Sequence, residues 1–493
     1  MTTASTIRQR WLAGHGPIVH GDETVERMEI LLTRLIAEGR VADETTAYTL
    51  LAAADRLSCV AMNVVAHMTY ARRIDLSGAA LSAEDFKPTP EGHTGGSLNM
   101  VPAFVGYLLA NALSATTRGW LMGQGHCVAA IEAINTLTGD LSPTQQGRYD
   151  RSAAGLARLI GDFYSYAIDA QGMPAVPLGS HAGPHTAGAV CEGGYLGFAG
   201  LQYVHMPLPG ECLVAFLSDG AFEEQRGPDW APRWWRAQDS GFAVPVMILN
   251  GRRIEQRTQI VQQGGAAWMA EDLRLNGFDP LIIDGRDPAA IAWAILEAEA
   301  RLQAFAADPQ RRYPAPLPYV IAVTEKGFGF PGAGSNAAHN LPLAANPHTD
   351  ARARQLFNTA ARADAWFASA TARAAIWTSD KALTALAGSA TGKARARACA
   401  KYTVHTMPGS DSEQTFPAPM GTPGEKFILI GWGTNAGGDI TISWRRESSA
   451  VGSLAGYVGP STTAALDNIV ALLGPVKANI TGGLTGYFGA VRV

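Results

Sequence analysis

Four apolar runs alternate with helix-like stretches between residues 211 and 324, and this order constrains the fold more than any other feature. The predicted strands are residues 212–218, 244–249, 280–284 and 318–324. A helix is expected from residue 288, because Asp287 suits an N-cap and Pro288 suits the first helical position. This alternation predicts an α/β protein with a doubly wound parallel sheet, which binds ligands at the carboxyl ends of its strands.

Polar residues follow three of these strands directly. Asp219 follows the first strand, Asn250 the second and Lys326 the last. Mg²⁺ prefers a few carboxylate, amide or carbonyl oxygens and keeps other positions for phosphate and water. We therefore expect Asp219, Asn250 and the backbone carbonyl of Arg252 to form a cation site, with Lys326 near a phosphate. Surface Asp-Gly and Asn-Gly turns and an ordinary strand-end lysine are the alternatives.

Four histidines lie in polar or Gly-rich loops, which predicts exposed loop tips near strand ends. They are His93, His126, His181 and His339. Neutral imidazoles around one pocket suit proton transfer and hydroxyl recognition near neutral pH. Any one of them taken alone is equally typical of a polar loop, but four in similar settings favour a functional pocket.

The rest of the chain divides by composition. Helices are expected over residues 22–40, 44–73 and 101–114, and a Pro/Gly-rich loop over residues 83–100. The predicted units are an N-terminal helical segment (1–45), the main domain (46–345), an Ala-rich helical segment (346–405), a Pro/Gly/Ser-rich linker (406–424) and a segment without a clear domain signature (425–493).

Charge and cysteine content exclude several classes of protein. The net charge of −4, from 39 basic and 43 acidic residues, argues against a nucleic-acid-binding or membrane-surface protein. Five scattered cysteines without a CxxC pair argue against a disulfide framework or structural zinc site. Neither a signal pattern nor an apolar run of about 18 residues is evident. We expect a soluble cytoplasmic protein.

Taken in order, the motifs resemble the diphosphate-binding domain of thiamine-diphosphate-dependent phosphoketolases, within the transketolase-like group. The resemblance covers roughly residues 50–343. It is carried by Gly92-His93-Thr94-Gly95-Gly96-Ser97-Leu98-Asn99, Gly123-Gln124-Gly125-His126, Ser180-His181, Glu192-Gly193-Gly194-Tyr195-Leu196-Gly197, Asp219-Gly220 with Asn250-Gly251, Lys326-Gly327 and Ala338-His339-Asn340-Leu341-Pro342-Leu343.

The resemblance implies a role for each matched residue. Asp219, Asn250 and the Arg252 carbonyl would hold Mg²⁺, and the four histidines would surround the thiazolium ring and the sugar. The residues matching cofactor contacts are Gly193, Gly194, Asp219, Gly220, Asn250 and Lys326. The implied reaction cleaves xylulose 5-phosphate or fructose 6-phosphate with phosphate, which gives acetyl phosphate and an aldose phosphate. A homodimer is also expected.

The chain departs from the family at the substrate side and in its length. Ala221 replaces the acid that usually follows Asp-Gly, so that Glu223 or Glu224 would stand in, while Cys191 and Cys127 replace a histidine and a glycine. These changes leave xylulose 5-phosphate 3-epimerase as an alternative activity. The part after residue 345 does not match the pyrimidine-side domain. A partner chain that supplies that domain, or an inactive remnant, is therefore a further alternative.

Overall fold

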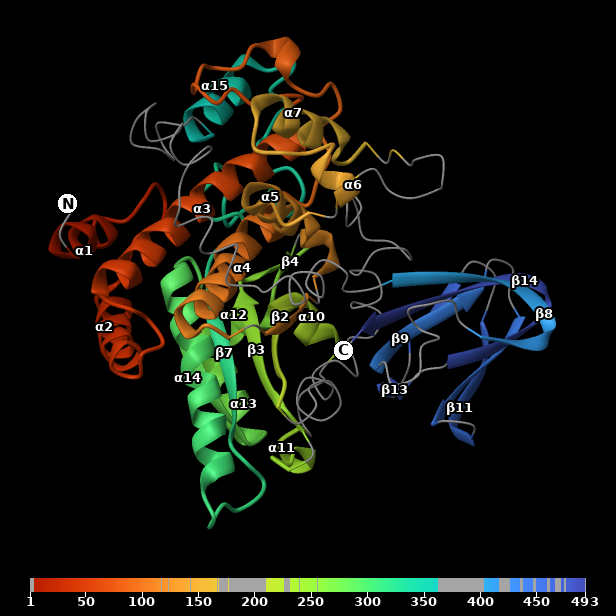
Figure 1. The fold of residues 1–493 in the computed structure, drawn as a ribbon. Helices are drawn as coiled ribbons and strands as arrows, with labels where there is room; N and C mark the ends of the chain where they lie inside the picture. Colours follow the sequence, from red (N-terminus) through yellow and green to blue (C-terminus); the bar gives the residue numbers. More distant parts are fainter. Residues whose placement is uncertain are drawn as a thin grey trace.

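The computed structural model describes two regions of the chain, shown in Figure 1. It describes residues 4–165 except 117, 123 and 142, residues 167 and 176, residues 210–225, and residues 231–361 except 239 and 255. Within residues 403–492 it describes the backbone of the strands alone. The predicted site residues His181, Gly193 and Gly194 fall outside the described residues, as does Cys191.

The first region is built on a five-stranded sheet in the order β1-β2-β3-β7-β6. Its strands are β1 (Gly119–Met122), β2 (Cys212–Ser218), β3 (Phe242–Leu249), β6 (Phe278–Asp284) and β7 (Leu317–Val323). Every neighbouring pair is parallel, which confirms the doubly wound α/β prediction. Strand β1 was missed because its four residues are too short to show an apolar run.

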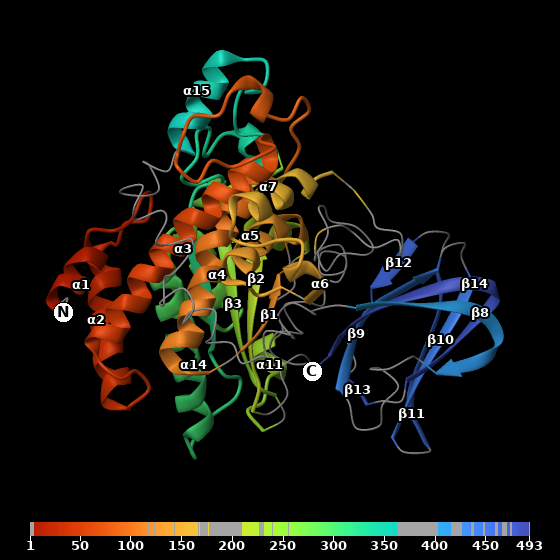
Figure 2. The same cartoon turned by 45° about the horizontal axis from the view of Figure 1, so that its top comes forward.

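Strand side chains alternate between two cores, as the pleat of a strand requires. Val214 and Phe216 of β2 join the core formed with helices α3, α4, α5 and α14. Ala215 and Leu217 join a second core with α12 and α13 on the other face. Figures 1 and 2 show α3, α4 and α14 gathered beside the sheet.

The helices follow the predicted order with shifted ends. Those that precede β2 are α1 (Ala4–Leu12), α2 (Asp22–Ala37), α3 (Glu44–Tyr70), α4 (Thr94–Ser114), α5 (Val128–Thr138), α6 (Pro143–Gln146) and α7 (Ala153–Asp162). Those that follow β2 are α10 (Asp219–Gln225), α11 (Ala231–Trp234), α12 (Gln259–Gln263), α13 (Ala266–Leu275), α14 (Pro288–Ala307) and α15 (Ala351–Ala360). Asp287 caps α14 as predicted, since its side chain accepts from the Ala289 amide at 2.8 Å.

Helix α4 begins earlier than the predicted residue 101 and takes in the end of the predicted loop. The glycines that suggested a loop permit close packing instead, because a Cβ on Gly95 would lie 2.1 Å from the Ala338 carbonyl oxygen. Helices α3 and α4 are long and apolar enough to cross a membrane, but 83% and 94% of their apolar windows are buried inside the protein. They therefore serve here as core helices.

The second described region is an antiparallel sheet in the order β11-β10-β14-β9-β12, with β13 on β9 and β8 on β14. Its strands are β8 (Thr403–Thr415), β9 (Lys426–Thr434), β10 (Gly438–Arg446), β11 (Ser449–Val458), β12 (Thr462–Ala465), β13 (Ala471–Leu473) and β14 (Val476–Arg492). Residues 406–415 of the predicted linker lie in β8, which pairs with β14.

Candidate active site

Asp219 lies where β2 passes into α10, at the carboxyl edge of the sheet. Strand β3 runs beside β2 in parallel register, with Ser218 opposite Ile248. Asn250 therefore emerges next to Asp219, although 31 positions separate them in the chain. Asp219 is 1% exposed and Asn250 is 9% exposed, so neither residue lies in an exposed surface turn.

The Asp219 carboxylate is surrounded by hydrogen-bond donors. The Gly251 amide donates to Oδ2 at 2.7 Å and the Thr258 hydroxyl at 3.3 Å, while the Gly220 amide donates to Oδ1 at 3.0 Å. Gly251 has φ +77°, a left-handed conformation that favours glycine. Burial nevertheless raises the pKa of Asp219 to about 7, against the lowering effect of these amides and of Lys326. A bound cation would favour the ionised carboxylate.

Asn250, Arg252 and Lys326 complete this corner. The Asn250 side-chain oxygen accepts from the Arg252 amide at 3.1 Å. The Lys326 ammonium donates to the Arg252 carbonyl at 3.4 Å. Lys326 is 4% exposed, and burial lowers its pKa while the negative charge of Asp219 opposes that effect. The oxygens of Asp219, Asn250 and Arg252 are the hard ligands that a divalent cation prefers, and Lys326 adds positive charge beside them.

His93, His126 and His339 form one cluster. His93 is the N-cap of α4, His126 lies in the 3₁₀ turn η2 (Gly125–Cys127) and His339 ends the 3₁₀ turn η4 (Asn336–His339). Their ring centroids are 5.1 Å apart for His93–His126, and 5.3 Å apart for His93–His339 and for His126–His339. All three are half-buried, so the prediction of exposed loop tips was wrong. Helix α4 and the loop after β7 pack together and partly enclose these rings.

His339 is held in the neutral form. Burial lowers its pKa to about 3, and the charges of Lys326, His126 and His93 act in the same direction. Its Nδ1 atom is buried and has no hydrogen-bond partner among the described residues. A neutral imidazole with an unused buried nitrogen can accept a proton or bind a polar group of a ligand.

Lys326 joins the histidine cluster to the Asp219 corner. A Cβ on Gly95 would lie 3.0 Å from Lys326 Cγ and 2.1 Å from the carbonyl oxygen of Ala338, the residue before His339. The Gly327 amide donates to the Gly95 carbonyl at 3.3 Å. The first turn of α4 therefore presses against both the stem of Lys326 and the loop that carries His339.

Two residues that support the site were not predicted. Asn99 on α4 donates from Nδ2 to the Glu325 carbonyl at 2.7 Å and so holds the turn that carries Lys326. Asn99 ends the Gly-His-Thr motif, which could have drawn attention to it. Thr258 shows no pattern in the sequence that would have identified it.

Glu223 and Glu224 are the acids expected to stand in for the one that Ala221 replaces. Glu223 accepts from the Ile260 amide at 2.5 Å and so binds a free amide in the first turn of α12. That hydrogen bond gives Glu223 a structural role. The side chain of Glu224 lies outside the described residues. Cys127 is 1% exposed, and a Cβ on Gly96 would lie 2.7 Å from its sulfur.

Comparison with known proteins places most of the first region in one family. The profile of the XFP N-terminal domain matches residues 46–373. A probable phosphoketolase of Streptomyces coelicolor is 30% identical over 291 residues, which covers 54% of this chain and 34% of that protein. One of Pseudomonas putida is 28% identical over 295 residues, with 54% and 35% covered. The chain thus spans about a third of the length of these relatives.

Among solved structures, the transketolase of Campylobacter jejuni aligns with 72% of this chain and 49% of its own, at 16% identity and a TM-score of 0.40. At that level of likeness, the fold class rests on the observed sheet topology, and the family rests on the match over residues 46–373. That match covers well over half of the chain, and the chain therefore belongs to the family of the XFP N-terminal domain, the N-terminal domain of phosphoketolases.

Proposed function

We propose that this chain provides the diphosphate- and magnesium-binding side of a thiamine-diphosphate-dependent phosphoketolase-type lyase, which acts on a sugar phosphate in the cytoplasm. The observation that supports it is the position of Lys326. This lysine lies between a buried Asp–Asn–carbonyl corner and three packed histidines, all at one edge of a parallel sheet. Such an edge is where doubly wound sheets bind ligands.

Each group has a distinct task in this proposal. Asp219, Asn250 and the Arg252 carbonyl would hold Mg²⁺, while Lys326 and the Gly220 backbone would face the diphosphate. When bound, thiamine diphosphate supplies the carbanion chemistry that carbon–carbon cleavage requires. The neutral His339 ring would take or give a proton at Nδ1, while His93 and His126 would orient sugar hydroxyls. His181, Gly193 and Gly194 are proposed from the family resemblance alone.

The relatives favour the lyase over the epimerase. Both relatives described above are named probable phosphoketolases, so the proposed products are acetyl phosphate and an aldose phosphate formed from xylulose 5-phosphate or fructose 6-phosphate. The matched region covers about a third of each relative, and we propose that it pairs with a partner chain that carries the pyrimidine-side part of the site. A homodimer of this chain, joined by such a partner chain, would complete the enzyme.

The proposal is tested by calorimetric titration of the chain with thiamine diphosphate and Mg²⁺ together, and with each alone. We expect binding that requires both ligands, because Asp219 and Asn250 would hold Mg²⁺ and its positive charge would favour binding of the diphosphate. If the folded chain leaves both ligands unbound, the proposed cofactor is wrong.

A second experiment tests the shared site. The chain is mixed with the remaining two thirds of the Streptomyces coelicolor relative, and acetyl phosphate is measured with xylulose 5-phosphate and phosphate. Acetyl phosphate that forms in the mixture, but with neither component by itself, would support a split enzyme. Ribulose 5-phosphate from this chain alone would contradict the lyase assignment.

A further inference from the structure

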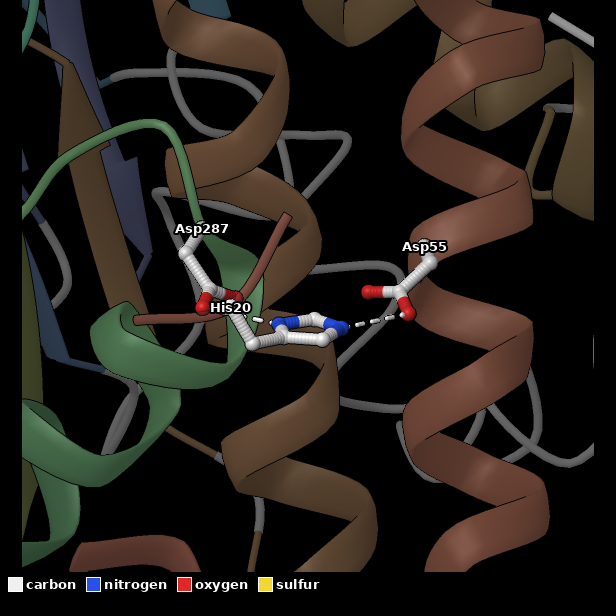
Figure 3. A group of neighbouring side chains, drawn as sticks. All are labelled: His20, Asp55 and Asp287. Atoms are coloured by element: carbon white, nitrogen blue, oxygen red, sulfur yellow. Dashed lines mark hydrogen bonds and ion pairs between the residues drawn. The ribbon is translucent and has the colours of Figure 1, made fainter. Parts of the chain in front are cut away.

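A second cluster of titratable side chains lies away from the candidate active site. His20 belongs to the N-terminal loop (residues 13–21), which connects α1 to α2 and precedes the family match. Its imidazole lies between Asp55 of α3 and Asp287, the N-cap of α14, as Figure 3 shows. The side chains of His20 and Asp287 are fully buried and that of Asp55 is 2% exposed.

Both nitrogens of the His20 ring are engaged. Nδ1 lies 2.9 Å from Asp287 Oδ2, and Nε2 lies 3.1 Å from Asp55 Oδ2. A neutral imidazole has a single N–H, so donation to two ionised carboxylates requires the imidazolium. Burial alone would lower the pKa of His20, but hydrogen bonds to Asp287 and Asp55 and their negative charge raise it to about 10. The ring is therefore charged at neutral pH.

Neighbouring contacts hold the same loop against α3. The indole ring of Trp11 lies against His20, with ring centroids 4.5 Å apart. The Cys59 thiol donates to the His15 carbonyl at 2.9 Å. His15 and Ile18 also exchange backbone hydrogen bonds of 2.9 and 3.0 Å, which close the loop into a tight turn.

The N-terminal loop reaches the turn behind the candidate active site. A Cβ on Gly329, which has φ +78°, would lie 3.4 Å from Pro17 Cβ and 2.6 Å from Met62 Cε. Gly329 belongs to the turn formed by residues 325–334, which also carries Lys326. From the side of α14, the guanidinium of Arg286, the residue before Asp287 in the chain, lies 5.8 Å from the Phe328 ring centroid.

We propose that His20, Asp55 and Asp287 form a buried ionic clasp, which fastens the N-terminal loop to α3 and α14 and thereby lets Pro17 support the turn behind Lys326. The clasp loosens in alkaline solution. Because the pKa of His20 lies above its ordinary value of 6.5, the stabilisation is complete below that pH and is lost as the pH rises towards about 10.

The other ionisable groups near the clasp do not account for the expected loss of stabilisation in alkaline solution. They are Tyr48, Arg56 and Cys59 of α3, Arg286 before α14, and His15 of the loop itself. Burial raises the pKa of Asp55 to about 6 and that of Cys59 well above its usual range. Asp55 is therefore ionised, and Cys59 neutral, over the range in which His20 loses its proton.

A metal site is the competing interpretation of the same residues. One nitrogen or oxygen from each of the three lies within 4.8 Å of the others, and Asp55 Oδ1 is buried with no hydrogen-bond partner among the described residues. However, the carboxylates face opposite edges of the imidazole ring (Figure 3). A single ion would reach both of them only after the ring turned, so the ionic clasp fits the observed geometry better.

The test follows the ring itself and the loop that it holds. Nitrogen and carbon NMR shifts of His20, assigned with His20→Gln, should show an imidazolium at about pH 8. Amide hydrogen exchange in residues 13–21, corrected for its chemical rate, should quicken as the pH rises towards about 10. Loop exchange in His20→Gln should be at least about tenfold faster near pH 8 and should slow again near pH 5, where Asp55, whose pKa burial raises to about 6, takes up a proton.

Two further variants keep the result interpretable. His67→Gln is the matched control. His67 is also buried on α3, but burial lowers its pKa to about 4, so amide exchange in residues 13–21 of His67→Gln should not slow when the pH is lowered to 5. Pro17→Ala should leave residues 13–21 protected and quicken exchange in residues 325–334 alone. A neutral His20 ring near pH 8, or unchanged loop exchange in His20→Gln, would overturn the clasp. One equivalent of Zn²⁺ or Mn²⁺ bound by the wild type and lost in His20→Gln would replace it with a metal site.

Discussion

His339 and His20 are both enclosed by the protein, but their neighbours carry opposite charge. Two other imidazoles and the Lys326 ammonium surround His339, and together with burial they lower its pKa to about 3. His20 lies between two carboxylates that raise its pKa to about 10. The first ring keeps an unused buried nitrogen, whereas hydrogen bonds occupy both nitrogens of the second.

The candidate active site has charged and polar groups that a ligand could engage, whereas the charges of the clasp are already paired with one another. The positive charge of His20 is already paired with the carboxylates of Asp55 and Asp287, so an added cation would stabilise them little. Asp219 is also buried, yet its pKa is raised to about 7 despite three donors and Lys326. The Asp219 corner therefore gains from an external cation, whereas the clasp already contains a cation, the His20 imidazolium.

The largest effect is expected from Asp219→Asn. We expect the affinity for thiamine diphosphate with Mg²⁺ to fall at least about 100-fold, or about 2.7 kcal/mol, because the single carboxylate of the cation corner is lost. Calorimetric titration measures the change. Asp284→Asn is the matched control, since Asp284 also ends a strand of the sheet but pairs with Arg286 at 2.8 Å. Equal losses in both variants would show that Asp219 is not specific to the site.

The strands and the corner were predictable, whereas the clasp was not. Apolar runs predicted β2, β3, β6 and β7 to within two residues at each end. Parallel order then brought Asp219, Asn250 and Lys326 to one edge. His20 gives no such signal, because its partners lie 35 and 267 positions away in the chain. Only packing of the N-terminal loop on α3 and α14 brings the three together.

Lys326→Met removes a positive charge that lowers the pKa of His339. The pKa of His339 should rise towards its ordinary value, but not reach it, because burial is the largest cause of the shift. Cofactor affinity should fall about tenfold through loss of a charged contact to the diphosphate. Histidine NMR and calorimetry measure the two effects. Lys87→Met is the control, since Lys87 is a half-buried lysine that donates to the Phe163 carbonyl at 3.1 Å and is not among the charges that shift the pKa of His339.

His339→Gln tests the sign of the electrostatics directly. A folded pKa of about 3, below the ordinary 6.5, means that the stabilisation from His339 is present above 6.5 and is lost as the pH falls towards 3. A fully buried group would lose about 2 kcal/mol at pH 5, and the half-buried ring should lose about 1 kcal/mol. Denaturant unfolding should therefore show a flatter acid limb in His339→Gln. A steeper acid limb would mean that this ring is charged in the folded protein.

The smallest effect is expected from Glu223→Gln, which tests whether Glu223 takes the place of the family's acid, replaced by Ala221, in the candidate active site. The Glu223 carboxylate accepts from the Ile260 amide at the start of α12, so its loss should cost about 0.5–1 kcal/mol of stability, as removal of a charged helix cap does. Cofactor affinity should change less than about twofold, because the carboxylate is engaged by the helix. Thermal unfolding and calorimetry on the same sample separate the two effects. An affinity loss as large as that of Asp219→Asn would instead place Glu223 at the cation corner, and Ala221 would then have shifted the family's acid by two positions without changing its role.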